Sequence, residues 1–290
     1  MKRFTGRFKT YRRRITIPDF HTQIKLIPFG DVHRHSPACD VTRWHQFLDR
    51  AKRDDNENTY YFGMGDYEDF ASTSERDILA HPKLHESTTA QFDKYAASLV
   101  DQFAEEIEFM RGRLLGLIEG HHFWLFESGL TSTHLLAARF NVPYLGNVCA
   151  FRLGVAIGKR NHGCAVDIIA AHGKEKSTSG KTVGHTINGV DHLRRIFPAA
   201  DIYLMAHDHQ KHAASKTILE VETGRGHHLV TKQKRQWLCR TGSFMRGYVE
   251  DEDSYVVREL YTPTDLGVVR GEIEIRRDEK GITKDIHFWS

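Results

Sequence analysis

The sequence predicts a layered α/β fold in which sheets are covered by helices, as in an αββα sandwich. Short apolar runs alternate with segments of helical period through the first two thirds of the chain. From about residue 212 onward the pattern becomes mainly that of β-strands. With 290 residues, 40% of them hydrophobic, the chain can bury a substantial core.

The elements follow from the local apolar period. Apolar runs predict strands at 24–29, 59–63, 114–119, 166–171 and 201–206. Apolar residues three or four positions apart predict helices at 41–53, 88–110, 131–140 and 186–197. The helix 88–110 is expected to bury one apolar stripe made of Phe92, Tyr95, Leu99, Phe103 and Ile107. Later β-segments are expected near 213–221, 227–232, 235–240 and 268–276.

Several features of the sequence exclude particular classes of protein. There is no internal repeat or proline-rich linker, so one domain is expected over residues 1–290. No run approaches the ~20 apolar residues of a membrane span, and Met1 to Arg14 lacks the apolar centre of a signal peptide. The cytoplasm is therefore the expected location, with no membrane partner. The four cysteines form no C-x-x-C pair, which excludes a zinc ribbon and favours reduced thiols.

The first fourteen residues are strongly basic, with seven Lys or Arg and no acidic residue. A basic arm of this kind could contact nucleic-acid phosphates. A solvated terminus, or a strand flanked by charge, is the favoured interpretation because an isolated charge run seldom marks a binding site.

Side chains that bind metals follow each of the five predicted strands. They are Asp31 and His33, then Asp66, then His121 and His122, then His172, and finally His207 and His209. Ligand sites in α/β sheets lie at the carboxyl ends of strands, so these segments are expected to converge. A carboxylate such as Asp66 can bridge two divalent ions ~3.5–4 Å apart, which is the arrangement that activates water for attack on phosphorus. Imidazoles favour transition metals over magnesium or calcium.

These motifs, in this order, resemble those of the calcineurin-like metallophosphoesterases. The segments are Asp31-Val-His33, Gly65-Asp66-Tyr-Glu-Asp69, Gly120-His121-His122, His172 and Ala206-His207-Asp-His209, and together they span residues 30–209. Each motif alone is weak, but five in order after apolar strands are hard to explain by chance. The Gly-His-His-Phe-Trp stretch looks more like that of small phage or bacterial members.

The resemblance implies a fold and a set of roles. The fold is an αββα sandwich of two mixed sheets flanked by helices, with the second sheet supplied by residues 212–290. Two divalent ions, of manganese, zinc, iron or nickel, would be bound. The first would be held by Asp31, His33, Asp66 and His209, and the second by Asp66, His121, His172 and His207. His122 resembles the family's catalytic histidine, which contacts the scissile phosphate and protonates the leaving oxygen.

Three positions depart from the family pattern. His121 stands where the family usually has Asn, so it either binds the second metal or turns away and leaves that metal weakly held. Ala206 replaces Gly, which affects only the backbone. Phe123 stands where the family often has an acidic residue or Arg, so substrate contacts there are open.

Other segments near the motifs have weaker interpretations. Asp69 is expected either to support the site from behind or to cap the next helix. The loop 173–182 lacks the first Gly of a P-loop, although Lys174, Lys176 or Lys181 could contact a substrate phosphate. Residues 240–244 could line the pocket or form a plain turn.

The expected function is hydrolysis of a phosphate ester by metal-activated water. A phosphodiesterase, including a nuclease, is favoured by the basic N-terminal segment and by His122. A phosphomonoesterase acting on nucleotides or phosphoproteins is the second hypothesis. The third is a non-catalytic scaffold that binds partner proteins, which would be expected to have lost ligands. The oligomeric state is not encoded in these patterns.

Overall fold

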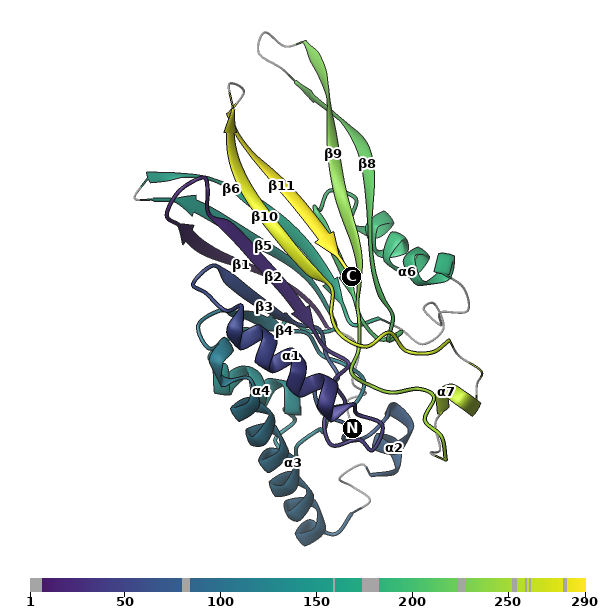
Figure 1. The fold of residues 1–290 in the computed structure, drawn as a ribbon. Helices are drawn as coiled ribbons and strands as arrows, with labels where there is room; N and C mark the ends of the chain where they lie inside the picture. Colours follow the sequence, from purple (N-terminus) through teal and green to yellow (C-terminus); the bar gives the residue numbers. More distant parts are fainter. Residues whose placement is uncertain are drawn as a thin grey trace.

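The computed structural model describes residues 7–79, 84–158, 160–173, 183–223, 228–251, 255–258, 260, 262–278 and 281–290. Over these residues the chain forms two mixed β-sheets packed face to face, with helices on both outer sides (Figure 1). The predicted fold class, two mixed sheets flanked by helices, is confirmed. Among the described residues, no helix has the length and apolar character needed to cross a membrane.

One sheet has six strands and joins segments from both halves of the chain. Its strands, in spatial order, are β1 (Phe8–Ile17), β5 (Val148–Ile157), β6 (Arg160–Ala171), β7 (Ile202–Met205), β9 (Leu229–Thr241) and β8 (Lys211–Thr223). The pairs β1–β5, β6–β7 and β7–β9 are parallel, whereas β5–β6 and β8–β9 are antiparallel.

The other sheet has five strands. In spatial order they are β11 (Gly281–Trp289), β10 (Arg270–Asp278), β2 (Gln23–Phe29), β3 (Thr59–Gly63) and β4 (Leu114–Leu117). The parallel strands β2, β3 and β4 end at the same edge of the sheet, because parallel neighbours run in the same direction. That edge is where the first three ligand-bearing loops begin.

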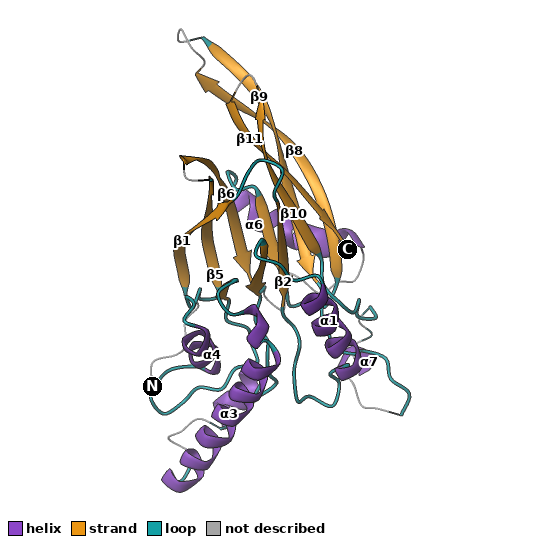
Figure 2. Cartoon of the chain, turned by 60° about the vertical axis from the view of Figure 1, so that its left-hand side comes forward, coloured by secondary structure: helices purple, strands orange, loops and turns teal. Residues whose placement is uncertain are grey.

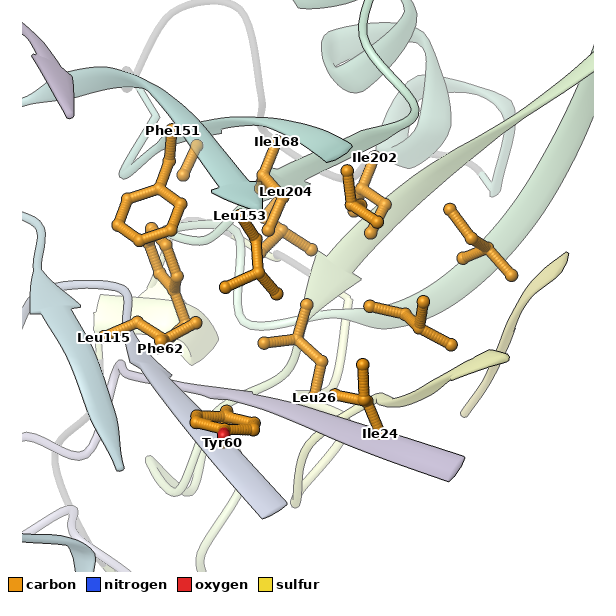
Figure 3. Close-up of a cluster of buried hydrophobic side chains, with 14 of the residues drawn as sticks. Ile24, Leu26, Tyr60, Phe62, Leu115, Phe151, Leu153, Ile168, Ile202 and Leu204 are labelled. Atoms are coloured by element: carbon orange, nitrogen blue, oxygen red, sulfur yellow. The ribbon is translucent and has the colours of Figure 1, made fainter. Parts of the chain in front are cut away.

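The main core lies between the two sheets (Figure 3). In β2, Ile24 and Leu26 belong to this inter-sheet core, while Ile27 and Phe29 belong to the cluster beneath the helices. A strand covered on both faces needs an almost continuous apolar run, which is the pattern that residues 24–29 show. Burial of both faces, at about 25 cal/mol per Å² of apolar surface, holds the strand and the loop that follows it in place.

Helices cover the outer face of each sheet. The five-stranded sheet is covered by α1 (Val41–Arg53), α3 (Glu86–Glu106) and α4 (Ser132–Phe140), and the six-stranded sheet by α6 (Val183–Ile196). The shorter elements are α2 (Thr73–Ile78), α7 (Tyr255–Arg258) and the 3₁₀ helix η2 (Glu108–Met110). The predicted bounds of α1 and β3 agree with the structure.

The prediction that α3 buries an apolar stripe from Phe92 to Ile107 is wrong for the first two residues of that stripe. Phe92 is 39% exposed and Tyr95 is 61% exposed. Further along α3, Leu99 is buried and Phe103 belongs to the core beneath the helices. The early turns of α3 extend beyond the sheets (Figure 2), so an apolar period there has no sheet to pack against.

The assignment of residues 212–290 to the second sheet is also wrong. The hairpin β8–β9 completes the six-stranded sheet. The pair β10–β11 extends the five-stranded sheet next to β2, on the side away from β3 and β4. Residues 229–232 and 235–240, from two separately predicted segments, belong to the single strand β9. A single domain over residues 1–290 stays a prediction.

The basic N-terminal segment is an edge strand over its described part. Residues 8–17 form β1, which pairs with β5 on one side only. Residues 1–6 lie outside the described residues. Charged side chains on an edge strand discourage pairing with other chains, so this run of charge has a structural explanation.

Candidate metal centre

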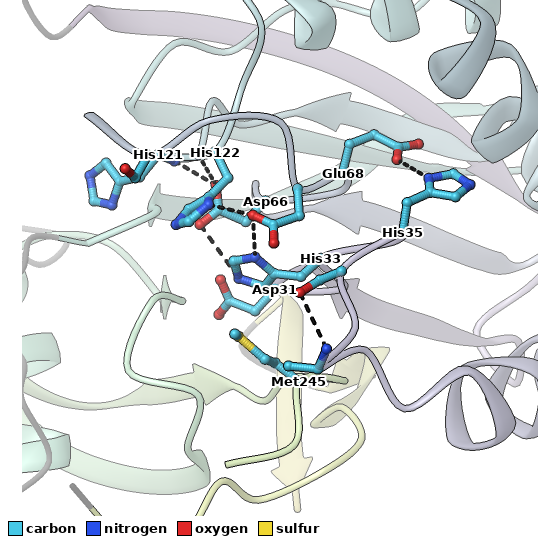
Figure 4. Close-up of polar contacts among 12 residues, drawn as sticks. Asp31, His33, His35, Asp66, Glu68, His121, His122 and Met245 are labelled. Carbon is cyan, nitrogen blue, oxygen red and sulfur yellow. Dashed lines mark hydrogen bonds and ion pairs between the residues drawn. The ribbon is translucent and has the colours of Figure 1, made fainter. Parts of the chain in front are cut away.

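The five predicted ligand-bearing segments meet at one edge of the sandwich. They follow β2, β3, β4, β6 and β7, and Figure 4 shows side chains from the first three of these segments gathered together. Two groups of side chains each offer a set of ligand atoms. Within each group, these atoms all lie within 4.8 Å of one another. The first group is Asp31, His33 and His209, and the second is Asp66, His121, His172 and His207.

The Asp66 carboxylate lies between the two groups. Its Oδ2 is 3.0 Å from Nε2 of His172 in the second group and 3.8 Å from Nε2 of His33 in the first. Its Oδ1 accepts hydrogen bonds from the backbone N–H groups of His121 (2.5 Å) and His122 (2.8 Å). This geometry holds Oδ2 in the place where a carboxylate could serve both groups.

His121 points into the second group. Its Nδ1 is 3.2 Å from Nδ1 of His207, and its ring centroid is 4.8 Å from that of His172. The alternative in which His121 turns away is therefore not the conformation of this structure. Its role as a metal ligand stays a prediction.

His122 is held differently from His121. Its Nδ1 is 2.6 Å from Oδ1 of Asp69, which leaves Nε2 as the other hydrogen-bonding atom of the ring. Desolvation acts to lower the pKa of His122, but the hydrogen bond to Asp69 and the charges of Asp66 and Asp69 raise it above its ordinary value. A histidine of this kind is charged more readily near neutral pH and can give up a proton.

Two further contacts refine these assignments. Asp69 does not cap α2, because Ser72 is the N-cap and accepts from the backbone N–H of Glu75. His33, Asp66 and His122 also form a group with ligand atoms within 4.8 Å. His122 is therefore close enough to a metal position that its predicted catalytic role needs a direct test.

The backbone is strained at five of the candidate ligands. Asp31, His33, Asp66, His207 and His209 have φ angles of 46°, 48°, 50°, 76° and 55°. Left-handed conformations are uncommon outside glycine, and each costs of order 1–3 kcal/mol that the surrounding structure must offset. Such strain concentrated in one cluster is typical of functional sites.

Two motif glycines let the loops approach one another. A Cβ on Gly120 would overlap Oδ1 of Asp66, and a Cβ on Gly65 would lie 2.6 Å from Nδ1 of His172. Gly65 also has a φ of 99°, which glycine adopts without steric cost. These glycines are therefore required by the close packing around Asp66.

The donor set fits divalent transition metals. Among buried atoms, Oδ1 of Asp31 and both ring nitrogens of His33 have no hydrogen-bond partner. Such atoms are costly to bury unless another partner, such as a cation, binds them. Desolvation, aided by the neighbouring His172, lowers the pKa of His207 to about 2 and that of His121 to about 4. Both imidazoles are therefore neutral, the form that binds metal.

His172 behaves in the opposite way. Desolvation acts to lower its pKa, but the carboxylates of Asp66 and Asp31 outweigh it and raise the pKa to about 9. Its Nδ1 is 2.8 Å from the carbonyl oxygen of Met64, so Nδ1 carries one proton of the ring. In the charged form Nε2, which faces Asp66, carries the second. A proton on Nε2 therefore occupies the place that a metal ion would take.

Residues 240–244 support the site from behind. Ser243 Oγ donates to the carbonyl oxygen of Asp31 at 3.0 Å, and the Phe244 N–H donates to the same oxygen at 2.9 Å. The segment thus holds the strained backbone at Asp31. It was expected only to line the pocket or to form a turn. Lys174, Lys176 and Lys181 lie outside the described residues.

The contacts of two arginines near the site were not predicted from the sequence, although Arg240 lies in the segment 240–244 that was expected to line the pocket or form a turn. Arg76 of α2 donates to the carbonyl oxygens of Ala71 and His121, and its guanidinium lies 3.9 Å from the centre of the Phe123 ring. Arg240 of β9 is fully buried and lies 3.1 Å from Asp208. Neither belongs to the five ligand-bearing motifs, and an arginine in a helix or strand pattern is usually on the surface.

Comparisons with known proteins place the chain near several solved structures at low similarity. No family profile matches the sequence, and no curated protein matches it. Vps29 of Entamoeba histolytica complexed with zinc is 10% identical, with a TM-score of 0.34, 92% of this chain covered and 99% of that one. A predicted phosphoesterase of Streptococcus pneumoniae is 12% identical, with a TM-score of 0.33 and coverage of 92% and 99%. Vps29 of Cryptosporidium parvum is 10% identical, with a TM-score of 0.34 and coverage of 92% and 98%. Values this low assign no family.

Proposed function

We propose that the chain is a two-metal phosphoesterase of the calcineurin-like type, with phosphodiesters, including those of nucleic acids, as its substrate class. The position of Asp66 carries this proposal, because its Oδ2 lies within 4 Å of a histidine nitrogen in each of the two groups. When two divalent ions are bound, they supply an activated water and neutralise charge on the phosphoryl oxygens.

The first ion would be held by Asp31, His33, Asp66 and His209. The second would be held by Asp66, His121, His172 and His207. The mixture of carboxylate and imidazole donors suits manganese, zinc, iron or nickel better than magnesium or calcium. The completeness of both groups argues against a scaffold with a degraded site.

His122 would serve as the acid that assists the leaving group. Its Nδ1 is fixed by Asp69, so the ring is oriented and Nε2 can donate a proton. An alkoxide leaving group needs such a proton, whereas an acidic phenol does not need it to the same degree. A catalytic acid therefore favours esters of ordinary alcohols over activated aryl esters as the substrate of this site.

The test is hydrolysis of bis-p-nitrophenyl phosphate, of p-nitrophenyl phosphate and of single-stranded DNA by the purified protein with manganese added. We expect faster turnover of the diesters than of the monoester. Faster turnover of the monoester would instead support a phosphomonoesterase acting on nucleotides or phosphoproteins. Inactivity toward all three, in protein that contains metal, would contradict the enzymatic proposal and favour a scaffold.

A further inference from the structure

A buried arginine lies against the loop that carries His207 and His209. Arg240 is contributed by β9, and its side chain is fully buried. Its Nε is 3.1 Å from Oδ2 of Asp208, the residue between the two histidines. A guanidinium is costly to bury unless its partners are well placed, so its surroundings show what it holds.

The guanidinium joins three segments of the chain. Nη1 donates to the carbonyl oxygen of Ala206 at 2.8 Å, and Nε donates to the carbonyl oxygen of Thr186 in α6 at 2.8 Å. Ala206 and Asp208 are the two neighbours of His207, so Arg240 contacts the loop on both sides of that residue. The planar guanidinium holds the hydrogen bonds to Thr186 and Ala206 at once, which a lysine cannot do, and its contact with Asp208 is an ion pair without a hydrogen bond.

The loop held in this way is the strained one. His207 and His209 have φ angles of 76° and 55°, and such conformations persist only where surrounding contacts determine them. Another contact on the loop is made by the His207 N–H, which donates to Oδ2 of Asp31 at 2.8 Å. Asp31 is itself a candidate ligand, whereas the hydrogen bonds and the ion pair of Arg240 described above go to Thr186, Ala206 and Asp208, which belong to neither group. Arg240 is therefore a support from outside the two metal groups.

We propose that Arg240 is a positioning residue of the metal centre, which holds His207 and His209 in the conformation that binds both ions. This inference rests on the proposed function, because it presupposes that the two histidines bind metal. Residues that support metal ligands from behind typically change metal affinity by about 10–100-fold when they are removed. Because one histidine belongs to each group, the loss should affect both ions.

A purely structural ion pair is the alternative, and the chain offers a matched control for it. Arg113 forms an ion pair with Asp55 and donates to the carbonyl oxygen of Phe109. It directly precedes β4, at the end of that strand opposite the loop that carries His121. Removal of Arg113 should therefore cost stability without touching the metal centre.

The experiment compares Arg240→Met, Arg240→Lys and Arg113→Met with the wild type. Each protein is stripped of metal and checked for folding by circular dichroism. Manganese affinity is then measured by calorimetry and thermal stability by its melting temperature. We expect Arg240→Met to weaken manganese binding about 10-fold or more. Arg240→Lys should recover part of the loss, and Arg113→Met should lower the melting temperature with unchanged affinity.

Several results would overturn the inference. Wild-type affinity in folded Arg240→Met would show that the ion pair is structural only, as would an equal loss of affinity in Arg113→Met. If Arg240→Met does not fold, Arg240→Lys decides, and unchanged affinity in that variant would contradict the positioning role. A wild-type protein that binds no manganese would contradict the proposed function as well, which separates the two failures.

Discussion

Oδ2 of Asp66 lies 3.0 Å from Nε2 of His172, and both side chains are buried. Without metal this contact is an ion pair, because the carboxylates of Asp66 and Asp31 raise the pKa of His172. With metal bound, the same two atoms would become ligands of one ion. The contact therefore links metal binding to protonation.

Asp66→Asn should remove metal from the protein. The change keeps the size of the side chain but removes the negative charge that both metal groups would share. The matched control is Asp69→Asn, which alters a carboxylate 2.6 Å from His122 that belongs to neither of the two proposed metal groups. Metal analysis after dialysis should show loss in the first variant and retention in the second. Equal retention in both would argue against a bridging role for Asp66.

Metal affinity should rise with pH near neutrality. The pKa of His172 is raised to about 9, so the metal-free protein holds a proton there that the metal must displace. Displacement of one proton makes affinity rise about tenfold per pH unit below the pKa. Manganese titrations at pH 6.5, 7.5 and 8.5 should show this slope, and His172→Gln, which also lacks one proposed ligand of the second ion, should bind manganese more weakly and with a flatter slope. A pH-independent affinity in the wild type would contradict the protonated state of His172.

The same pKa fixes the sign of the stability change in metal-free protein. A histidine whose pKa is raised on folding stabilises the fold fully below its unfolded pKa of about 6.5. That contribution is lost as the pH rises through about 9. Urea unfolding with a chelator present should therefore show that His172→Gln costs less stability at pH 9 than at pH 6.5. A larger cost at pH 9 would reverse the assignment.

His122→Ala should slow turnover of single-stranded DNA by about 10²–10⁴-fold, and that of bis-p-nitrophenyl phosphate by less, while it leaves the metal content close to that of the wild type. The reason is that His122 would donate a proton rather than hold an ion. His33→Ala is the matched comparison, because His33 belongs to the first metal group and should lose metal. If His122→Ala loses its metals and His121→Ala keeps them, the roles of these two histidines are exchanged.

Gly120→Ala should disrupt the site more than an ordinary glycine replacement would. The added Cβ would overlap the Asp66 carboxylate, so the loop or the carboxylate must move. Gly154 is the control, because a Cβ there would meet its nearest atom at an ordinary 3.7 Å. We expect metal loss and a lower melting temperature for Gly120→Ala, and near wild-type behaviour for Gly154→Ala. Similar melting temperatures and metal contents in the two variants would contradict the packing argument.

The candidate site could be predicted where a metal-binding side chain directly follows a recognisable apolar strand. His33 and Asp66 each follow an apolar strand, and the parallel neighbours β2 and β3 end at one edge of their sheet, so the proximity of these two side chains could be predicted. The α3 stripe at Phe92 and Tyr95 could not be predicted correctly, because the helical period does not show where the sheet ends beneath a helix. The burial of Arg240 was not predicted, because burial of a charge depends on distant partners such as Thr186.

The pairing of the last strands shows the same limit. Both β8–β9 and β10–β11 have strand patterns, but edge pairing with one sheet or the other is decided by contacts far apart in the sequence. Local pattern therefore predicts that a segment is a strand more reliably than which sheet it joins.

The most direct test is the metal content of the purified wild-type protein, measured by inductively coupled plasma mass spectrometry after dialysis against manganese-containing and then metal-free buffer. The two groups that share Asp66 predict close to two transition-metal ions per chain, lost together in Asp66→Asn. A wild-type protein that retains no transition metal, or a content unchanged by Asp66→Asn, would contradict the binuclear centre.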